Sequence, residues 1–255
     1  MPIESFDGYR RNDDYLRDVA RGGVEGARPF SGFGERVTSG AESGVIWPDG
    51  AFAIPPASGL QLSVASTSAD DAAGGTGVRS IVILYLDAEL EERTLFLALD
   101  GLTPVLTPAT DIRFVQYMFM LSAGSGGVAA GTISASVGAQ VYSQIPAGSL
   151  RCASSVRMVP REKRLVVTTV YAGSSSGSAS AKAIIHMASP NFSGYDFTAS
   201  STFFPLASAT FQDNSNGLTL PCPLAFSEGQ VFGLTFSVDK AATVTGSWFG
   251  FLEKE

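Results

Sequence analysis

The sequence predicts an all-β protein made of antiparallel strands. Short apolar runs recur roughly every ten to fifteen residues, which is the spacing of a sandwich and not of alternating strand and helix. Gly- and Ser-rich segments such as Ser122–Ile133 separate these runs. Apolar residues make up 45% of the chain and charged residues 16%, which excludes intrinsic disorder. We therefore expect an antiparallel β-sandwich, jelly-roll-like, with an extended N-terminal arm containing one short helix.

The first forty residues differ in composition from the rest, because they hold seven acidic residues and six arginines. The segment Asn12–Gly22 is typical of one short helix of about nine residues, with an Asn or Asp cap and Gly22 as its stop. A helix this short needs a partner in water. We expect residues 1–44 to form an anchoring arm and residues 45–255 to form the sandwich body.

Aromatic and basic side chains in this arm are candidate docking groups, since both types are frequent at protein interfaces. The alternative is a floppy N-terminus with incidental aromatics. The candidate arm residues are Tyr9, Arg10, Arg11, Tyr15, Leu16, Arg17, Phe30 and Phe33.

The segment Trp47–Gly50, near the start of the body, contains a proline and a glycine in positions typical of a turn, and predicted strands follow it. The apolar run within Val78–Leu86 predicts burial on both faces. Asp100–Gly101 suits a tight hairpin between two neighbouring strands. The strands predicted before residue 140 are Leu60–Val64, Val78–Leu86, Arg93–Leu99, Thr103–Thr107, Arg113–Leu121 and Gly131–Val137.

The second half also alternates short apolar runs with turn-forming segments, but its sequence does not repeat that of the first half. One continuous two-sheet body is therefore favoured over two copies of a smaller one, and a break near residues 146–163 stays open. The strands predicted here are Arg164–Ala172, Ala181–Ala188, Thr202–Phe211, Leu218–Leu220, Gln230–Val238 and Thr243–Leu252.

Few side chains suit catalysis. His186 is the single imidazole and lies in an apolar strand, so a core or interface role is favoured over a triad or metal site. Cys152 and Cys222 lack identifiable basic partners, and we take both as small core residues.

Paired carboxylates suit a glycosidase, but nothing shows that Asp70 with Asp71, or Glu89 with Glu91 and Glu92, converge. Asp70 and Asp71 also offer oxygen ligands to calcium, although a polar turn is favoured. We expect no enzyme, no cofactor and no bound metal.

The net charge of −7 argues against nucleic acid as a partner. One basic segment stands out as a candidate docking patch for an acidic surface, with a solvated loop as the alternative. It comprises Arg151, Arg157, Arg161, Lys163 and Arg164. The apolar runs are too short for membrane helices, and no secretory signal is visible, which predicts synthesis in the cytosol.

Several segments in order resemble virion structural proteins of tailed bacteriophages of marine and freshwater bacteria. The resemblance spans about residues 45–253. It implies a non-enzymatic particle component with a jelly-roll-like body. The segments are Ser68–Val82, Leu86–Asp87, Leu99–Gly101, Thr103–Val105, Ala123–Ile133, Pro223–Glu228 and Gly250–Glu253, and Asp70 stands where the group has asparagine.

We expect a component that docks through its arm onto other virion proteins, such as the major capsid or portal and collar proteins, and that self-associates. A trimer is the first expectation, because cyclic symmetry hides apolar strand faces and edges. The favoured position is the head exterior, as a decoration, cement or vertex-spike protein. The alternative is a collar or tail fibre that contacts host-surface glycan.

Overall fold

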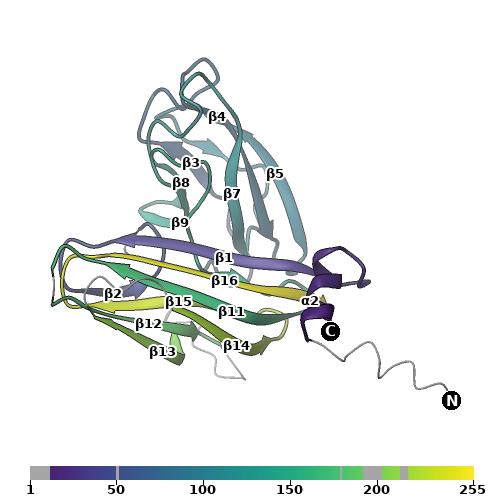
Figure 1. The fold of residues 1–255 in the computed structure, drawn as a ribbon. Coiled ribbons are helices and arrows are strands. Elements are labelled where there is room, and N and C mark those ends of the chain that lie inside the picture. Colours follow the sequence, from purple (N-terminus) through teal and green to yellow (C-terminus); the bar gives the residue numbers. More distant parts are fainter. Residues whose placement is uncertain (1–11, 50–51, 179, 192–202, 213–217) are drawn as a thin grey trace.

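The computed structural model describes residues 12–49, 52–178, 180–191, 203–212 and 218–255. The prediction of an all-β chain with antiparallel strands is confirmed, with four sheets in the described part (Figure 1). Two of these sheets are built from the two ends of the sequence, and we call them the terminal module. The other two are built from the middle of the sequence, and we call them the central module.

The first sheet of the terminal module has the order β1-β16-β11-β14. The N-terminal and C-terminal strands therefore lie side by side, paired along the whole of β1. Its strands are β1 (Arg28–Val37), β11 (Lys163–Ser175), β14 (Leu218–Phe226) and β16 (Thr243–Lys254).

The second sheet has β15 and β12 at its centre and β13 at one edge. Along its other side, β15 pairs with β2 at one end and with β10 at the other. The strands are β2 (Glu42–Val45), β10 (Arg157–Met158), β12 (Lys182–Ser189), β13 (Phe204–Gln212) and β15 (Val231–Val238).

The central module contains a sheet of order β6-β3-β8-β9 and a sheet of order β5-β4-β7. Its strands all lie between β2 and β10 in the sequence, so the module is an insertion into the terminal one. They are β3 (Ser63–Ser66), β4 (Val78–Leu86), β5 (Glu92–Ala98), β6 (Val105–Leu106), β7 (Phe114–Ala123), β8 (Ile133–Val137) and β9 (Gln140–Ile145).

Each module has its own hydrophobic core. In the terminal module, side chains of both sheets, such as Trp248 from β16 and Phe232 from β15, pack in one cluster. In the central module, Ile83 of β4 and Ile133 of β8 belong to a second cluster. A smaller third cluster, which includes Trp47, joins the two modules.

Three expectations need correction. The chain forms four sheets and not one two-sheet body, and it returns from the central to the terminal module at residues 153–158. Asp100–Gly101 is a turn, with Thr103 N donating to Asp100 O, but it does not close a hairpin. The strands on either side enter different sheets, because β5 pairs with β4 and β6 pairs with β3.

The third correction concerns the arm. Residues 28–45 are not outside the body, since β1 and β2 are strands of the two terminal-module sheets. The physical reason is burial, because Phe30 packs in the core against Trp248 with ring centroids 5.9 Å apart. Removal of residues 1–36 would therefore take a core strand from the body.

Candidate interaction surfaces

The predicted helix is present as α2 (Asn12–Ala20), and it packs on the end of the first sheet. The Tyr15 ring meets the edge of Phe251 at 5.2 Å, and the Tyr15 hydroxyl donates to Glu253 at 3.3 Å. Leu16 is half-buried and Arg17 is exposed. Gly22 follows the helix with φ of 74°, as its predicted role as a stop requires. Tyr9, Arg10 and Arg11 lie outside the described residues.

The two phenylalanines predicted as docking residues, Phe30 and Phe33, lie on opposite faces of strand β1. Phe30 points into the core, whereas Phe33 is 38% exposed on the outer face of the sheet. Strand alternation explains this, because residues an odd number of positions apart point to opposite faces. Of the two, only Phe33 is placed to contact a partner.

Phe33 belongs to an aromatic group on the outer face of the first sheet. It lies opposite Ser247 of β16, and Ser247 lies opposite Tyr171 of β11. Phe249, two residues further along β16, is 59% exposed and diagonal to both rings. We call Phe33, Tyr171 and Phe249 the aromatic face.

Sequence reasoning missed Tyr171 and Phe249, because both lie in largely apolar strands where an outward ring looks like a core residue. The signal that finds them is the position of each along its strand. Trp248 and Val170 are buried, so their neighbours Phe249 and Tyr171 must point outward.

A groove of about 820 Å³ borders the aromatic face between β1 and the segment Pro146–Ala153. Its lining includes Phe33, Glu35, Leu150 and Arg151. The Arg151 guanidinium stacks on the Phe33 ring at 5.9 Å, so one residue from each predicted docking set meets here. The groove is apolar for most of its described lining.

The predicted basic patch is divided by the fold. Arg161 pairs with Glu91 at 3.6 Å, and Arg164 pairs with Glu253, with Nε 2.8 Å from the carboxylate. Lys163 donates to the carbonyl of Gly26. Together with Arg151 in the groove and Arg157 in the interior, these residues do not form one exposed surface.

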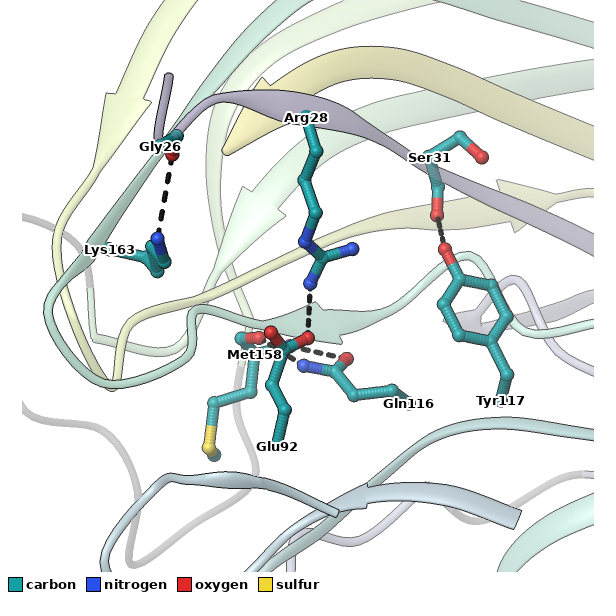
Figure 2. A network of polar contacts seen from close by, with 8 residues as sticks. All are labelled: Gly26, Arg28, Ser31, Glu92, Gln116, Tyr117, Met158 and Lys163. Atoms are coloured by element: carbon teal, nitrogen blue, oxygen red, sulfur yellow. Dashed lines mark hydrogen bonds and ion pairs between the residues drawn. The ribbon is translucent and has the colours of Figure 1, made fainter. Parts of the chain in front are cut away.

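The two modules meet in a polar network that Figure 2 shows in detail. Arg28 of β1 forms an ion pair with Glu92 of β5, and the Tyr117 hydroxyl of β7 donates to the carbonyl of Ser31 at 2.5 Å. The Gln116 side chain bonds the backbone of Met158 through both its amide nitrogen and its oxygen. These contacts join β1 and β10 directly to the central module.

Arg157 sits inside this junction and is 2% exposed. Its guanidinium lies 3.9 Å from the centre of the Tyr117 ring, and Nη1 donates to the carbonyls of Ser154 and Val156. Among the described residues its Nε has no hydrogen-bond partner. We assign Arg157 to the connection between modules, not to an outer docking patch.

Asp71 is a fully buried carboxylate that ties loops of the central module together. It accepts hydrogen bonds from Ser66 Oγ at 2.6 Å and from the backbone N–H groups of Val78, Ala130 and Gly131 at 2.7 to 2.9 Å. Burial acts to raise the pKa of Asp71, but these four hydrogen bonds outweigh it and hold the pKa below its usual value. Asp70 beside it is exposed, so the pair does not converge.

A second acidic group brings carboxylate oxygens of Asp87, Glu89 and Asp111 within 4.8 Å of one another. Asp87 already accepts from Glu89 N, Glu91 N and Arg93 Nε. Burial acts to raise its pKa, and these hydrogen bonds, that from Arg93 foremost, lower it overall. Asp87 therefore serves the turn between β4 and β5.

His186 and Cys152 each form a hydrogen bond within the sheets or loops that hold them. Nδ1 of His186 lies 2.6 Å from Ser208 Oγ, and burial lowers the pKa of the imidazole. Cys152 is a buried free thiol whose sulfur accepts from Met118 N at 3.3 Å. The side chain of Cys222 lies outside the described residues.

No protein-family model matches the sequence, and no curated protein matches it. Two solved structures show a distant likeness. A chain from the structure of infectious bursal disease virus, Gt strain, has 10% identity and a TM-score of 0.22, covering 94% of this chain and 78% of that one. A chain from a crystal structure of a particle of the same virus has 9% identity and a TM-score of 0.19, covering 89% and 73%. At these TM-scores neither structure establishes a fold or a function.

In the described part of the chain, no helix has the length and apolar character that a membrane span requires.

Proposed function

We propose that this chain is a non-enzymatic structural component of a tailed-phage particle and that it docks through the aromatic face. The observation that carries the proposal is the uncovered aromatic face itself. Three aromatic rings with few charges beside them are typical of the centre of a protein interface, where aromatic side chains supply most of the binding energy.

The strand order of the terminal module supports a jelly-roll body. If its strands other than the two-residue β10 are lettered B to I in chain order, from β1, β2 and then β11 to β16, the two sheets have the orders B-I-D-G and C-H-E-F. That is the order of a double-sheet jelly roll, an architecture frequent in viral capsid proteins. The central module is then an insertion between the second and third strands. The sequence resemblance to tailed-phage virion proteins favours the same class of function.

The groove beside the aromatic face supports a binding role over a catalytic one. Its described lining offers one carboxylate, one guanidinium and a buried thiol that already accepts a hydrogen bond. Acid–base catalysis needs titratable groups that converge on one reacting atom. The groove instead extends the docking surface, with Arg151 held on Phe33.

The position on the particle that we favour is the head exterior, as a decoration, cement or vertex-spike protein. A separate N-terminal arm is confined to residues before β1, because β1 and β2 belong to the body and Phe33 of β1 is part of the aromatic face. Tyr9, Arg10 and Arg11 remain candidate docking groups, and α2 contributes Arg17 on its exposed side.

The test uses particles assembled without the native chain and supplied with variants. Phe249→Ser should lower the number of copies per purified particle by about tenfold or more, as expected for loss of a buried interface aromatic. Leu102→Ser is the matched control, since Leu102 is 61% exposed in the central module against 59% for Phe249. It should leave the copy number unchanged.

Full incorporation of Phe249→Ser would overturn docking through the aromatic face. Absence of the wild-type chain from assembled heads, together with binding to host cells or capsular glycan, would favour the collar or tail-fibre alternative. Turnover of host polysaccharide by the purified chain would refute a non-enzymatic role.

A further inference from the structure

Strand β5 is the open edge of the central-module sheet β5-β4-β7. Within the described part of the chain it pairs with β4 alone, in a regular register over its seven residues. Figure 1 shows β5 at the outer margin of the module. An unpaired edge presents a row of backbone N–H and C=O groups that another strand can complete.

Four other edge strands carry features that discourage pairing. β13 contains Pro205, and β14 contains Pro221 and Pro223, each of which lacks an N–H donor. β6 has two residues, and β9 has an irregular register with β8. β5 has no proline and no bulge. Charge is confined to its first two residues, Glu92 and Arg93.

The hydrogen bonds that flank β5 show which residues face the open edge. Leu99 N donates to Arg79 O beyond one end of the strand, and Asp87 N donates to Glu91 O beyond the other. Antiparallel pairs alternate between bonded and non-bonded, so the odd-numbered residues of β5 bond β4. The N–H and C=O groups of the even-numbered residues Glu92, Thr94, Phe96 and Ala98 therefore point outward.

Beyond Glu92, whose carboxylate pairs with Arg28, the side chains of the residues that face this edge are apolar or small. Phe96 is 64% exposed on the outer face, and Thr94 and Ala98 are exposed on the same face. Leu95 and Leu97 point into the core. A large exposed ring on an open strand edge is the feature that pairing with another strand would bury.

We propose that β5 pairs antiparallel with β5 of a second copy of this chain, across a two-fold axis at Leu95. In this register Thr94 lies opposite Phe96 of the partner subunit, and Glu92 lies opposite Ala98 of the partner subunit. All four outward-facing residues then exchange backbone hydrogen bonds with the second copy. The sheet becomes six-stranded and continuous across two chains.

The side chains are self-complementary in this register. An aromatic ring meets a β-branched residue, which is a favourable cross-strand pair, and the two Phe96 rings are diagonal neighbours across the axis. Glu92 and Arg93 face Ala98 and Leu97 of the partner subunit, so no like charges are opposed. These features select a second copy as the occupant. The contact lies outside the aromatic face, so it does not depend on the proposed function.

The test is the oligomeric state of the full chain by sedimentation velocity over a range of concentrations. The wild type should form dimers. Thr94→Pro removes an outward donor without removing a bond to β4, and Phe96→Lys places two charges beside the axis. Both should weaken dimerisation by about tenfold or more. Phe249→Lys, a matched change at an exposed aromatic residue of the other module, should leave it unchanged.

The register has its own test. The double variant Thr94→Cys with Phe96→Cys places the two thiols on directly opposed residues of different chains, where the backbone spacing fits a disulfide. Mild oxidation should give a covalent dimer that reductant reverses, and the wild type under the same oxidation gives the background from Cys152 and Cys222. A monomeric wild type, dimers unaffected by Thr94→Pro and Phe96→Lys, or no covalent dimer would each overturn the proposal.

Because Phe249 and Phe96 belong to different surfaces, the two proposals fail separately. A variant that no longer joins particles but still dimerises identifies a role of the aromatic face in docking. A variant that no longer dimerises but still joins particles identifies a role of β5 in dimerisation.

Discussion

Asp71 is the clearest case of one residue with a large structural role. Its carboxylate joins the loop after β3, the start of β4 and the loop before β8. The sequence shows two adjacent aspartates in a polar turn, and either of them suits a turn. It does not show that one of them is buried, because the donors at Ala130 and Gly131 come from a distant loop.

We predict that Asp71→Asn lowers the free energy of unfolding by about 2–4 kcal/mol, because an amide nitrogen would face backbone donors in a buried site. Asp70→Asn is the control and should change it by less than about 0.5 kcal/mol, since Asp70 is exposed. Urea unfolding followed by circular dichroism measures both. Equal losses in the two variants would contradict the assignment.

The pH dependence follows from the lowered pKa of Asp71 in the folded chain. The unfolded carboxyl titrates at about 3.9, so the ionised group stabilises the fold above that pH. This stabilisation is lost as the pH falls through the lower folded value. We predict that wild-type stability decreases below about pH 4 and that Asp71→Asn shows a shallower decrease. Parallel pH profiles for the two proteins would contradict this prediction.

At the scale of the element, β1 shows where sequence reasoning reached its limit. The sequence predicts β4 with its correct bounds, because its continuous apolar run is distinctive. In β1 the residues Pro29, Ser31, Gly32 and Gly34 look like a loop. Gly32 is needed because a Cβ there would lie 2.4 Å from Trp248 Nε1, which donates to Ser155 O. Such close packing appears only when distant strands are placed together.

We predict opposite outcomes for the two phenylalanines of β1. Phe30→Ala should lower the free energy of unfolding by about 3–5 kcal/mol, because it leaves a cavity beside Trp248. Phe33→Ala should cost less than about 1 kcal/mol, since the ring is partly exposed, and should reduce particle incorporation instead. Thermal unfolding and copy number per particle measure the two effects. A stable Phe30→Ala variant would show that β1 is dispensable for the core.

The candidate surface was predictable only in part for the same reason. Phe33 and Arg151 were each selected from the sequence as docking residues, and the fold brings them together in the groove. Composition does not identify their neighbours Tyr171 and Phe249 as docking residues, because the face of the sheet to which a side chain points depends on the register of its strand. Arg157 was selected for its charge, and its burial beneath Tyr117 depends on the junction between modules.

For the whole molecule, the insertion of one module into the other determines how stability is divided. The central module has a core cluster formed within residues 60–152. Both ends of this segment bond to the module itself, through Leu60 with Ile112 and Cys152 with Met118. The terminal module has no such continuity, because its first sheet needs both ends of the chain.

We predict that a fragment of residues 59–153 folds alone, because its hydrophobic cluster and sheet pairings are internal. It should show β-type circular dichroism and one cooperative thermal transition. The full chain, measured in parallel, is the reference for the same signal. A fragment without a cooperative transition would show that the junction at Arg28, Tyr117 and Gln116 is required for the central module to fold.

The pairing of β1 with β16 also sets an order of events during translation. Strand β1 leaves the ribosome before its partner β16, so β1 stays unpaired until the segment between them has been translated. The inserted module can complete its own fold in that interval. Nascent chains therefore contain a folded central module and an incomplete terminal module. In that state Phe30 is exposed, and it is a surface that a ribosome-associated chaperone would bind.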